Sequence, residues 1–223
     1  MVSSGSRRLW WGGQAASGDA GRLEAFSDGI LAIAITLLIL DVHVDKVEGR
    51  SLADGLQHAS PELIAFAASF LQIGILWANH HVLFRLIGRV DQFLLLANLL
   101  LLAGVSFLPF PTRLIADYTH GDDATTAMLL YGGTFTLCAV AFNLIWHYAS
   151  RRGLLREGID PRFHRDVTIR YGWTMIVYVI STLLALVDRW LTLGACTLLA
   201  LLYVLGPTPR AAFLPDRPTP DQQ

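Results

Sequence analysis

The residues of this sequence whose types could support chemistry stand at the ends of its first two long apolar runs. Ser27 and Asp28 head the first run. The second run closes on a polar and aromatic cluster made of Trp77, Asn79, His80 and His81. A carboxylate near imidazole and indole groups can form a hydrogen-bond network, relay protons or help to bind a metal ion. The elements that carry these residues decide among the three.

Metal binding and catalysis are disfavoured by the spacing of these residues. His80 and His81 are adjacent, so on a helix they point about 100° apart and cannot easily bind one ion together. The sequence has no HExxH or CxxC pattern, no nucleophile elbow, no P-loop and no paired carboxylates suited to hydrolysis. Cys138 and Cys196 fall inside apolar runs, as small buried side chains do. We therefore predict no enzymatic activity, no metal site and no cofactor.

The composition indicates an integral membrane protein. The chain has 223 residues, of which 53% are hydrophobic and 16% are charged, and its mean hydropathy is +0.47. Soluble domains carry about 25% charged residues. The formal net charge is -1 and no basic patch points to nucleic acid, so the expected surroundings are a lipid bilayer.

Six apolar segments are long enough to cross a bilayer core, which takes roughly 20 helical residues. They lie at 23–42, 61–84, 92–115, 125–149, 168–187 and 190–206. Only the "VDRW" stretch separates the last two, which predicts an antiparallel helical hairpin. The expected fold is an all-α membrane domain over 22–206. A flexible Gly- and Ser-rich arm at 1–21 precedes it, and a disordered Pro-rich tail at 207–223 follows it.

The distribution of basic residues predicts that both chain termini are cytoplasmic. With this orientation the cytoplasmic side carries Arg7, Arg8, Arg22, Arg85, Arg89, Arg151, Arg152, Arg156, Arg162, Arg165, Arg170, Arg210 and Arg217. The outer side carries Lys46, Arg50, Arg113 and Arg189. The acidic stretches "DVHVDKVEGRSLADG" and "DYTHGDD" fall on the outer side, which agrees with the same orientation.

Helical geometry separates two faces of the first apolar segment. With 100° per residue and Ile33 at zero, Phe26, Leu37 and Leu40 all fall within about 40° of it. Thr36 lies near -60°, whereas Asp28 lies near -140°. Ser27 and Asp28 could simply cap the helix N-terminus. The alternative is that Asp28 faces a neighbouring helix.

The second segment supplies partners for Asp28. If the first two helices pack antiparallel, both polar clusters share one depth, and a hydrogen bond from His80 or Trp77 to Asp28 is geometrically natural. Other polar residues within the segments are expected to form hydrogen bonds between helices. These are Asn98, Ser106, Asn143, His147 and Thr182.

The residues that head these segments resemble those of a known family. Arg22, Phe26, Ser27 and Asp28 fit the R-x-x-x-F-S-D signature of the transmembrane protein 175 family, and the chain is similar in length and six-span plan to its prokaryotic branch. The W-x-x-H element at Trp77 and His80 looks like the family's second-helix motif.

This resemblance implies a potassium-selective channel in a prokaryotic plasma membrane, assembled as a homotetramer with the first helices lining a central pore. By offset from the signature, Ile33 would form the constriction, Thr36 the neighbouring polar layer, and Leu37 and Leu40 further apolar rings. A network that holds the pore helices would comprise Arg22, Phe26, Ser27, Asp28, Trp77, Asn79 and His80.

Two alternatives stay open at this stage. The first is a proton-coupled secondary transporter that uses Asp28 and His80 as a relay, although the sequence shows neither an internal repeat nor a Gly/Pro break in the first segment. The second is a structural or accessory membrane protein.

A channel formed by this sequence could not use a carbonyl filter, because no TVGYG-like run is present. A ring of four Ile33 side chains would instead act by dewetting and by stripping water from the ion.

Overall fold

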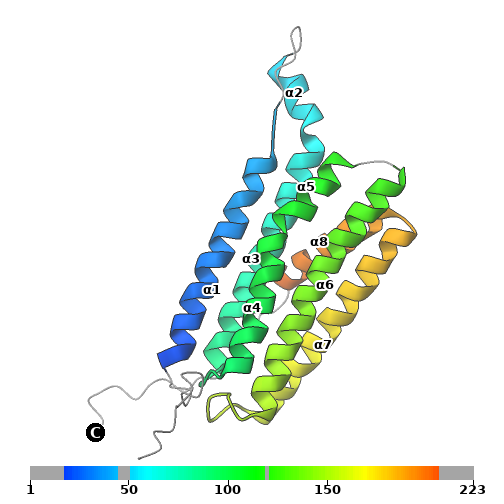
Figure 1. Cartoon of the computed structure of the whole chain (residues 1–223). Coiled ribbons are helices and arrows are strands. Elements are labelled where there is room, and N and C mark those ends of the chain that lie inside the picture. The colour runs from blue at the N-terminus through cyan, green and yellow to red at the C-terminus, as the bar shows by residue number, and fades with distance from the viewer. Residues whose placement is uncertain (1–17, 45–50, 119–120, 206–223) are drawn as a thin grey trace, which may run out of the picture.

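The computed structural model describes residues 18–44, 51–118 and 121–205, and this part of the chain is helical (Figure 1). The α-helices are α1 (Gly18–Leu37), α2 (Leu52–His58), α3 (Ser60–Leu86), α4 (Gln92–Phe107), α5 (Pro109–Asp117), α6 (Gly121–Arg151), α7 (Pro161–Leu183) and α8 (Arg189–Leu205). Two 3-10 turns extend α1 and α7, namely η1 (Leu38–Asp41) and η2 (Leu184–Leu186). The expected all-α class is confirmed.

Five stretches are long and apolar enough to cross a bilayer core. They are Ala20–Asp41, Ser60–Leu86, Gln92–Asp117, Gly121–Arg151 and Pro161–Leu186, and they correspond to the first five expected segments. The sixth expected segment, 190–206, corresponds to α8, in which the apolar stretch Leu191–Leu201 is shorter than the other five. The fold is thus that of a multi-pass helical membrane protein.

Three details differ from the sequence-based expectation. The segment at 92–115 was expected to be one helix, but it divides at Leu108 into α4 and α5. The break comes just before Pro109, whose nitrogen cannot donate a hydrogen bond and whose ring disfavours a helical conformation in the preceding residue. The helix α1 begins at Gly18, so the last residues of the expected arm are helical. The rest of that arm and the tail at 207–223 lie outside the described residues.

The third difference is the short helix α2, which the sequence analysis did not anticipate. Ser51 caps it, because the Ser51 hydroxyl accepts from the Asp54 backbone N–H while the Asp54 carboxylate accepts from the Ser51 backbone N–H. The hydrogen bonds from Ser51 lower the pKa of Asp54. The S-x-x-D spacing is a recognised capping-box signal and could have predicted this helix.

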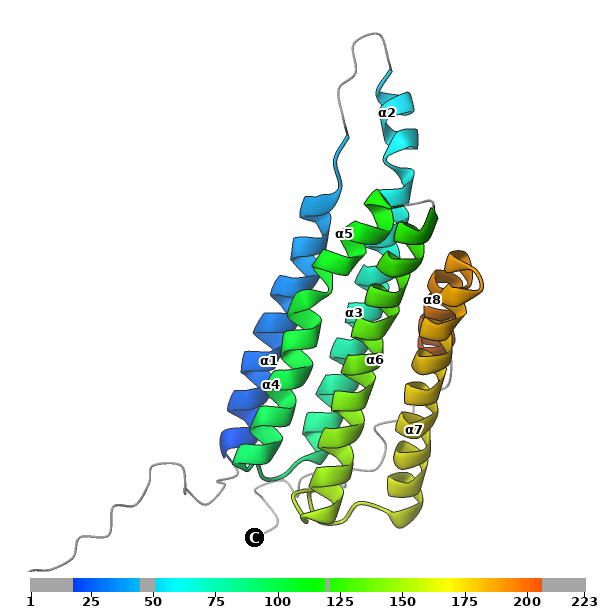
Figure 2. The ribbon, with the colours of Figure 1, turned by 45° about the vertical axis from the view of Figure 1, so that its right-hand side comes forward.

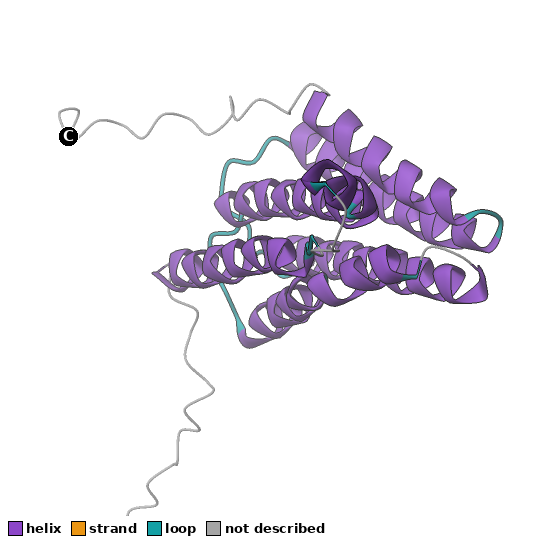
Figure 3. Cartoon of the chain, turned by 90° about the horizontal axis from the view of Figure 1, so that it is seen from above, coloured by secondary structure: helices purple, strands orange, loops and turns teal. Residues whose placement is uncertain are grey.

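The long helices form one bundle with α1 and α7 at opposite edges (Figures 1 and 2). The first helix packs against α3 and α4, and α6 packs against α4, α5 and α7. Viewed from above, the helices are inclined to one another (Figure 3). Beyond η2 the chain turns back, and α8 packs against α3, α6 and α7.

Several polar side chains inside the bundle are hydrogen-bonded to one another, as a low-dielectric interior favours. The Gln72 amide donates to the Cys196 carbonyl at 2.7 Å and accepts from the Tyr178 hydroxyl at 2.8 Å. The hydroxyls of Ser69 and Thr112 are hydrogen-bonded at 2.8 Å. These contacts join α3 to α5, α7 and α8 beside the buried rings of Tyr131, Phe135 and Tyr178.

The α3–α4 and α6–α7 connections pair at one end of the bundle. The backbone N–H of Gly88 donates to the Leu154 carbonyl at 2.8 Å, and that of Arg156 donates to the Leu86 carbonyl at 2.9 Å. The Arg89 guanidinium donates to the Gly153 carbonyl at 2.8 Å. The same end holds the start of α1 (Figure 1).

Two adjacent glycines of α6 give a matched test of helix packing. A Cβ atom on Gly132 would lie 2.7 Å from the Thr182 Oγ1 and 3.1 Å from its Cα, whereas one on Gly133 would meet nothing within 4 Å. We expect Gly132→Ala to destabilise the bundle by about 1–3 kcal/mol, because α6 and α7 must move apart. Gly133→Ala should leave the protein as stable or stabilise it by up to about 1 kcal/mol.

Thermal unfolding in detergent measures both variants. Equal melting temperatures for Gly132→Ala and Gly133→Ala would show that the close approach of α6 and α7 at Gly132 is not needed for the stability of the bundle.

Candidate functional site

The first helix keeps one long apolar face uncovered. Ile33 is 60% exposed, Leu37 41% and Leu40 66%, although all three are large aliphatic side chains. Phe26 continues the face toward the start of the helix and is 53% exposed. The opposite face is buried against α3 and α4 through Leu31, Ala34 and Leu38. A face of this kind lies against lipid, another subunit or a pore.

Thr36 places an oxygen at the edge of this face. Its side chain is exposed, and its hydroxyl lies 3.0 Å from the Ala32 carbonyl and 2.9 Å from the Ile33 carbonyl of the preceding turn. The hydroxyl hydrogen is therefore directed back into the helix, and the oxygen lone pairs are left to point away from it. Such a group can accept a hydrogen bond or contact a cation.

A buried hydrogen-bond chain fixes the rotation of α1. The His80 Nε2 and the Asn98 Oδ1 are 3.0 Å apart, the Asn98 amide donates to the Ser27 hydroxyl at 2.9 Å, and that hydroxyl donates to the Leu23 carbonyl at 2.8 Å. All three side chains are fully buried. Since the Asn98 Oδ1 can only accept, His80 must be the donor at Nε2, and the chain runs in one direction. Ser27 is thereby joined to both α3 and α4. It lies in the middle of α1, as does Asp28, so neither residue caps the helix N-terminus.

Asp28 and Glu24 bind α3 nearer the surface of the bundle. The Trp77 Nε1 donates to the Asp28 Oδ1 at 3.1 Å, and the His81 Nδ1 lies 2.8 Å from the Glu24 Oε1. The Trp77 and His81 rings stack with their centroids 6.2 Å apart. Of the two partners expected for Asp28, the structure therefore supplies Trp77, while His80 is bonded to Asn98.

Three further residues of the expected network lie apart from this chain of contacts. Phe26 lies on the uncovered face of α1 and is exposed. Arg22 is exposed and has no ion-pair partner among the described residues. Asn79 donates to the Ile75 carbonyl of its own helix at 3.0 Å, and it lines a cavity between α3, α6, α7 and α8. Asn79 and Trp77 lie about 160° apart around α3, so they point to nearly opposite sides of the helix.

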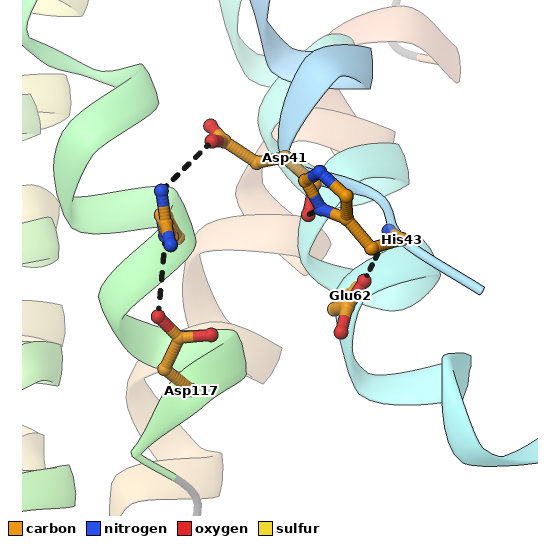
Figure 4. Close-up of polar contacts among 5 residues, drawn as sticks. Asp41, His43, Glu62 and Asp117 are labelled. Atoms are coloured by element: carbon orange, nitrogen blue, oxygen red, sulfur yellow. Dashed lines mark hydrogen bonds and ion pairs between the residues drawn. The ribbon is translucent and has the colours of Figure 1, made fainter. Parts of the chain in front are cut away.

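The far end of α1 is held by charged groups that the sequence analysis did not single out (Figure 4). Arg113 of α5 lies 3.9 Å from Asp41 and donates to Asp117 at 3.3 Å. The His43 backbone N–H donates to the Glu62 carboxylate at 2.7 Å, and its Nδ1 lies 3.0 Å from the Asp41 carbonyl. Arg113 stood out in the sequence only as a basic residue on the acidic side. Its pairing with Asp41 requires knowing that α5 bends over the end of α1.

Among the described residues, Asp28 and His80 do not share a hydrogen bond that could serve as the direct relay of a proton-coupled transporter. The hydrogen-bond chain from His80 ends on the Leu23 carbonyl, and Asp28 is bonded to Trp77 instead. A carbonyl cannot carry a proton onward at neutral pH, so nothing in this geometry favours the transporter.

These helices and the uncovered face of α1 define the class of the protein, a multi-pass helical membrane protein. Bacterial channels are similar to it over most of their length. A potassium channel of Chamaesiphon minutus is 38% identical over 191 residues, which cover 84% of this chain and 94% of that protein. A potassium channel of Streptomyces collinus is 41% identical over 197 residues, which cover 86% and 94%.

The family model described as the endosomal/lysosomal potassium channel TMEM175 matches residues 22–109. The crystal structure of a lysosomal potassium-selective channel TMEM175 homolog from Chamaesiphon minutus matches the fold with a TM-score of 0.76 and 37% identity, covering 84% of this chain and 97% of that one. The chain belongs to the TMEM175 family, and the resemblance noted in the sequence is confirmed. These relatives are channels and not enzymes.

The buried hydrogen-bond chain at Ser27 yields a stability prediction. Asn98→Leu keeps a similar volume but leaves the His80 Nε2–H and the Ser27 hydroxyl without their partner, and we expect it to cost about 1–3 kcal/mol. Glu24→Gln weakens a more exposed pair and should change stability by less than about 1 kcal/mol. Thermal unfolding of the two variants in detergent measures the difference. An Asn98→Leu protein as stable as Glu24→Gln would mean that the buried chain does not hold α1.

Proposed function

We propose that this chain forms a homotetrameric, potassium-selective channel in a prokaryotic cell membrane, with the first helices around a central pore. The observation that carries the proposal is the uncovered apolar face of α1 in a helix whose other face is fixed by buried hydrogen bonds. The names and functions of the bacterial relatives support it. Potassium is the permeant ion, and no cofactor is required.

In this proposal Ile33 forms the narrowest ring of the pore. Four such side chains leave no polar group to replace the hydration shell of an ion, so passage requires partial dehydration. Potassium loses its water more readily than sodium, which is the basis of selectivity here. Thr36 supplies an oxygen next to the ring, and Leu37 and Leu40 form apolar rings beyond it.

The proposed orientation places the start of α1 and the paired α3–α4 and α6–α7 connections in the cytoplasm. Basic residues gather at that end of the described chain, and they include Arg22, Arg85, Arg89, Arg151, Arg152, Arg156, Arg162, Arg165 and Arg170. The outer end carries Asp41, Glu62 and Asp117 around Arg113. In the proposed fold α8 is a short sixth span, antiparallel to α7, and returns the chain toward the cytoplasm.

The constriction can be tested with a matched pair of substitutions. Ile33→Asn puts an amide into the proposed ring on α1, whereas Ile39→Asn changes an exposed isoleucine of η1 that the proposal does not place in the ring. We expect Ile33→Asn to bring the ratio of potassium to sodium permeability close to one and to raise the conductance, because the polar group lowers the dehydration barrier. Ile39→Asn should keep the selectivity.

Thr36→Ala is expected to reduce selectivity in the same assay, since it removes the only polar layer proposed beside the ring. Reversal potentials of proteoliposomes under opposed potassium and sodium gradients measure these ratios. Unaltered currents in both Ile33→Asn and Thr36→Ala would exclude the assigned constriction.

Assembly gives a second test. Asp28→Ala removes the acceptor of the Trp77 Nε1 at the surface between α1 and α3, and we expect it to shift the protein from tetramers to smaller species. Trp77→Phe, which keeps a ring but removes the donor, should shift it in the same direction. Size-exclusion chromatography with light scattering in detergent reports the mass. Intact tetramers of normal thermal stability in both variants would contradict the role of this contact.

A further inference from the structure

The far end of the first membrane segment is built differently from α1 itself. Its residues Leu38–Asp41 form the 3-10 turn η1, in which hydrogen bonds have poorer geometry than in an α-helix. Leu38 is buried, whereas Leu40 is 66% exposed on the uncovered face. The turn packs against α3 and α5. Because its own hydrogen bonds are weak, the position of η1 depends on these neighbours.

Two contacts hold this end, and both come from the bundle (Figure 4). Arg113 of α5 lies 3.9 Å from the Asp41 carboxylate. Just beyond η1, the His43 backbone N–H donates to the Glu62 carboxylate of α3 at 2.7 Å. Since α3 and α5 cover the side of the segment opposite to the uncovered face, both contacts draw its end toward the bundle and away from that face.

Arg113 is shared between two carboxylates. Its Nε donates to Asp117, four residues further along α5, at 3.3 Å, which is shorter than the distance to Asp41. The Arg113 side chain is 59% exposed, so neither pair is fixed by burial. A guanidinium that moves toward Asp117 releases Asp41, and one that moves toward Asp41 holds η1 more firmly. The two carboxylates therefore compete for one cation.

We propose that Arg113 positions the Leu40 ring of the proposed pore. Its attraction for Asp41 holds η1 against α3 and α5, which keeps the four Leu40 side chains of a tetramer apart. When the contact is lost, η1 moves toward the pore axis and the apolar ring narrows, so that it loses its water and stops conducting. The inference rests on the proposed tetrameric channel, because only there does Leu40 line the ion path. Arg113 acts on the ion through Leu40 and does not touch it.

Single-channel recordings of the full chain in planar bilayers test this role. We expect Arg113→Gln and Asp41→Asn each to lower the ratio of open to closed time by at least about twofold, because an exposed ion pair changes an equilibrium by up to about fivefold and four pairs act on one pore. Arg113→Lys should keep most of the open probability. The double variant should be no worse than either single one, since both remove the same contact. The ratio of potassium to sodium permeability should stay unchanged, because Ile33 is not moved.

Asp117→Asn separates positioning from a simple surface-charge effect. It removes the competing carboxylate, so Arg113 moves to Asp41 and the open probability should rise. If these residues acted only by attracting potassium to the pore mouth, Arg113→Gln would raise the current, and Asp41→Asn and Asp117→Asn would both lower it. Asp122→Asn changes an exposed acidic residue of α6 at the same end, and it should leave the open probability unchanged.

Two results would overturn the role of Arg113 in a protein that carries potassium current. One is an unchanged or raised open probability in Arg113→Gln. The other is a fall in Asp117→Asn by the same factor as in Asp41→Asn. An unsubstituted protein that passes no potassium current in the same bilayers would instead refute the proposed function, and the role of Arg113 with it.

Discussion

The structure depends on one constraint, which is that polar side chains inside a membrane must find partners within the protein. In the middle of α1 this constraint is met by the directed chain from His80 through Asn98 to Ser27. Because Ser27 must meet Asn98, the rotation of α1 about its axis is fixed. The face that carries Ile33 is then turned away from the bundle, and it remains apolar and uncovered. The proposed pore follows from this rotation.

The two ends of the molecule are held differently. Solvent-accessible charged groups hold the far end of α1, where Arg113 lies between Asp41 and Asp117. At the basic end, α3 contributes to two different environments, with Trp77 bonded to α1 on one face and Asn79 lining a cavity between α3, α6, α7 and α8 on another.

Much of the fold could be predicted from the sequence, because a bilayer sets a minimum length for apolar helices. The angular position of Ile33, Leu37 and Leu40 was also predictable, since it depends only on helical periodicity. The hydrogen-bond partners of individual side chains were harder to predict, because the sequence does not show which helices pack against each other. Asn98 looked like any other polar residue in an apolar segment, and its position between Ser27 and His80 requires knowing that α4 packs on α1. The capping box of α2 and the break before Pro109 did have local signals, which length and hydropathy alone overlook.

The most direct test of the account is whether Ile33 lies in the path of the ion. The measurement is the potassium current of Ile33→Cys channels in proteoliposomes, before and after a cationic methanethiosulfonate reagent. The native Cys138 and Cys196 are fully buried, so the unsubstituted channel serves as the control. The account predicts that the reagent blocks the current of Ile33→Cys and leaves the unsubstituted channel unaffected. A current that persists through Ile33→Cys channels after complete labelling, shown by mass spectrometry, would contradict it.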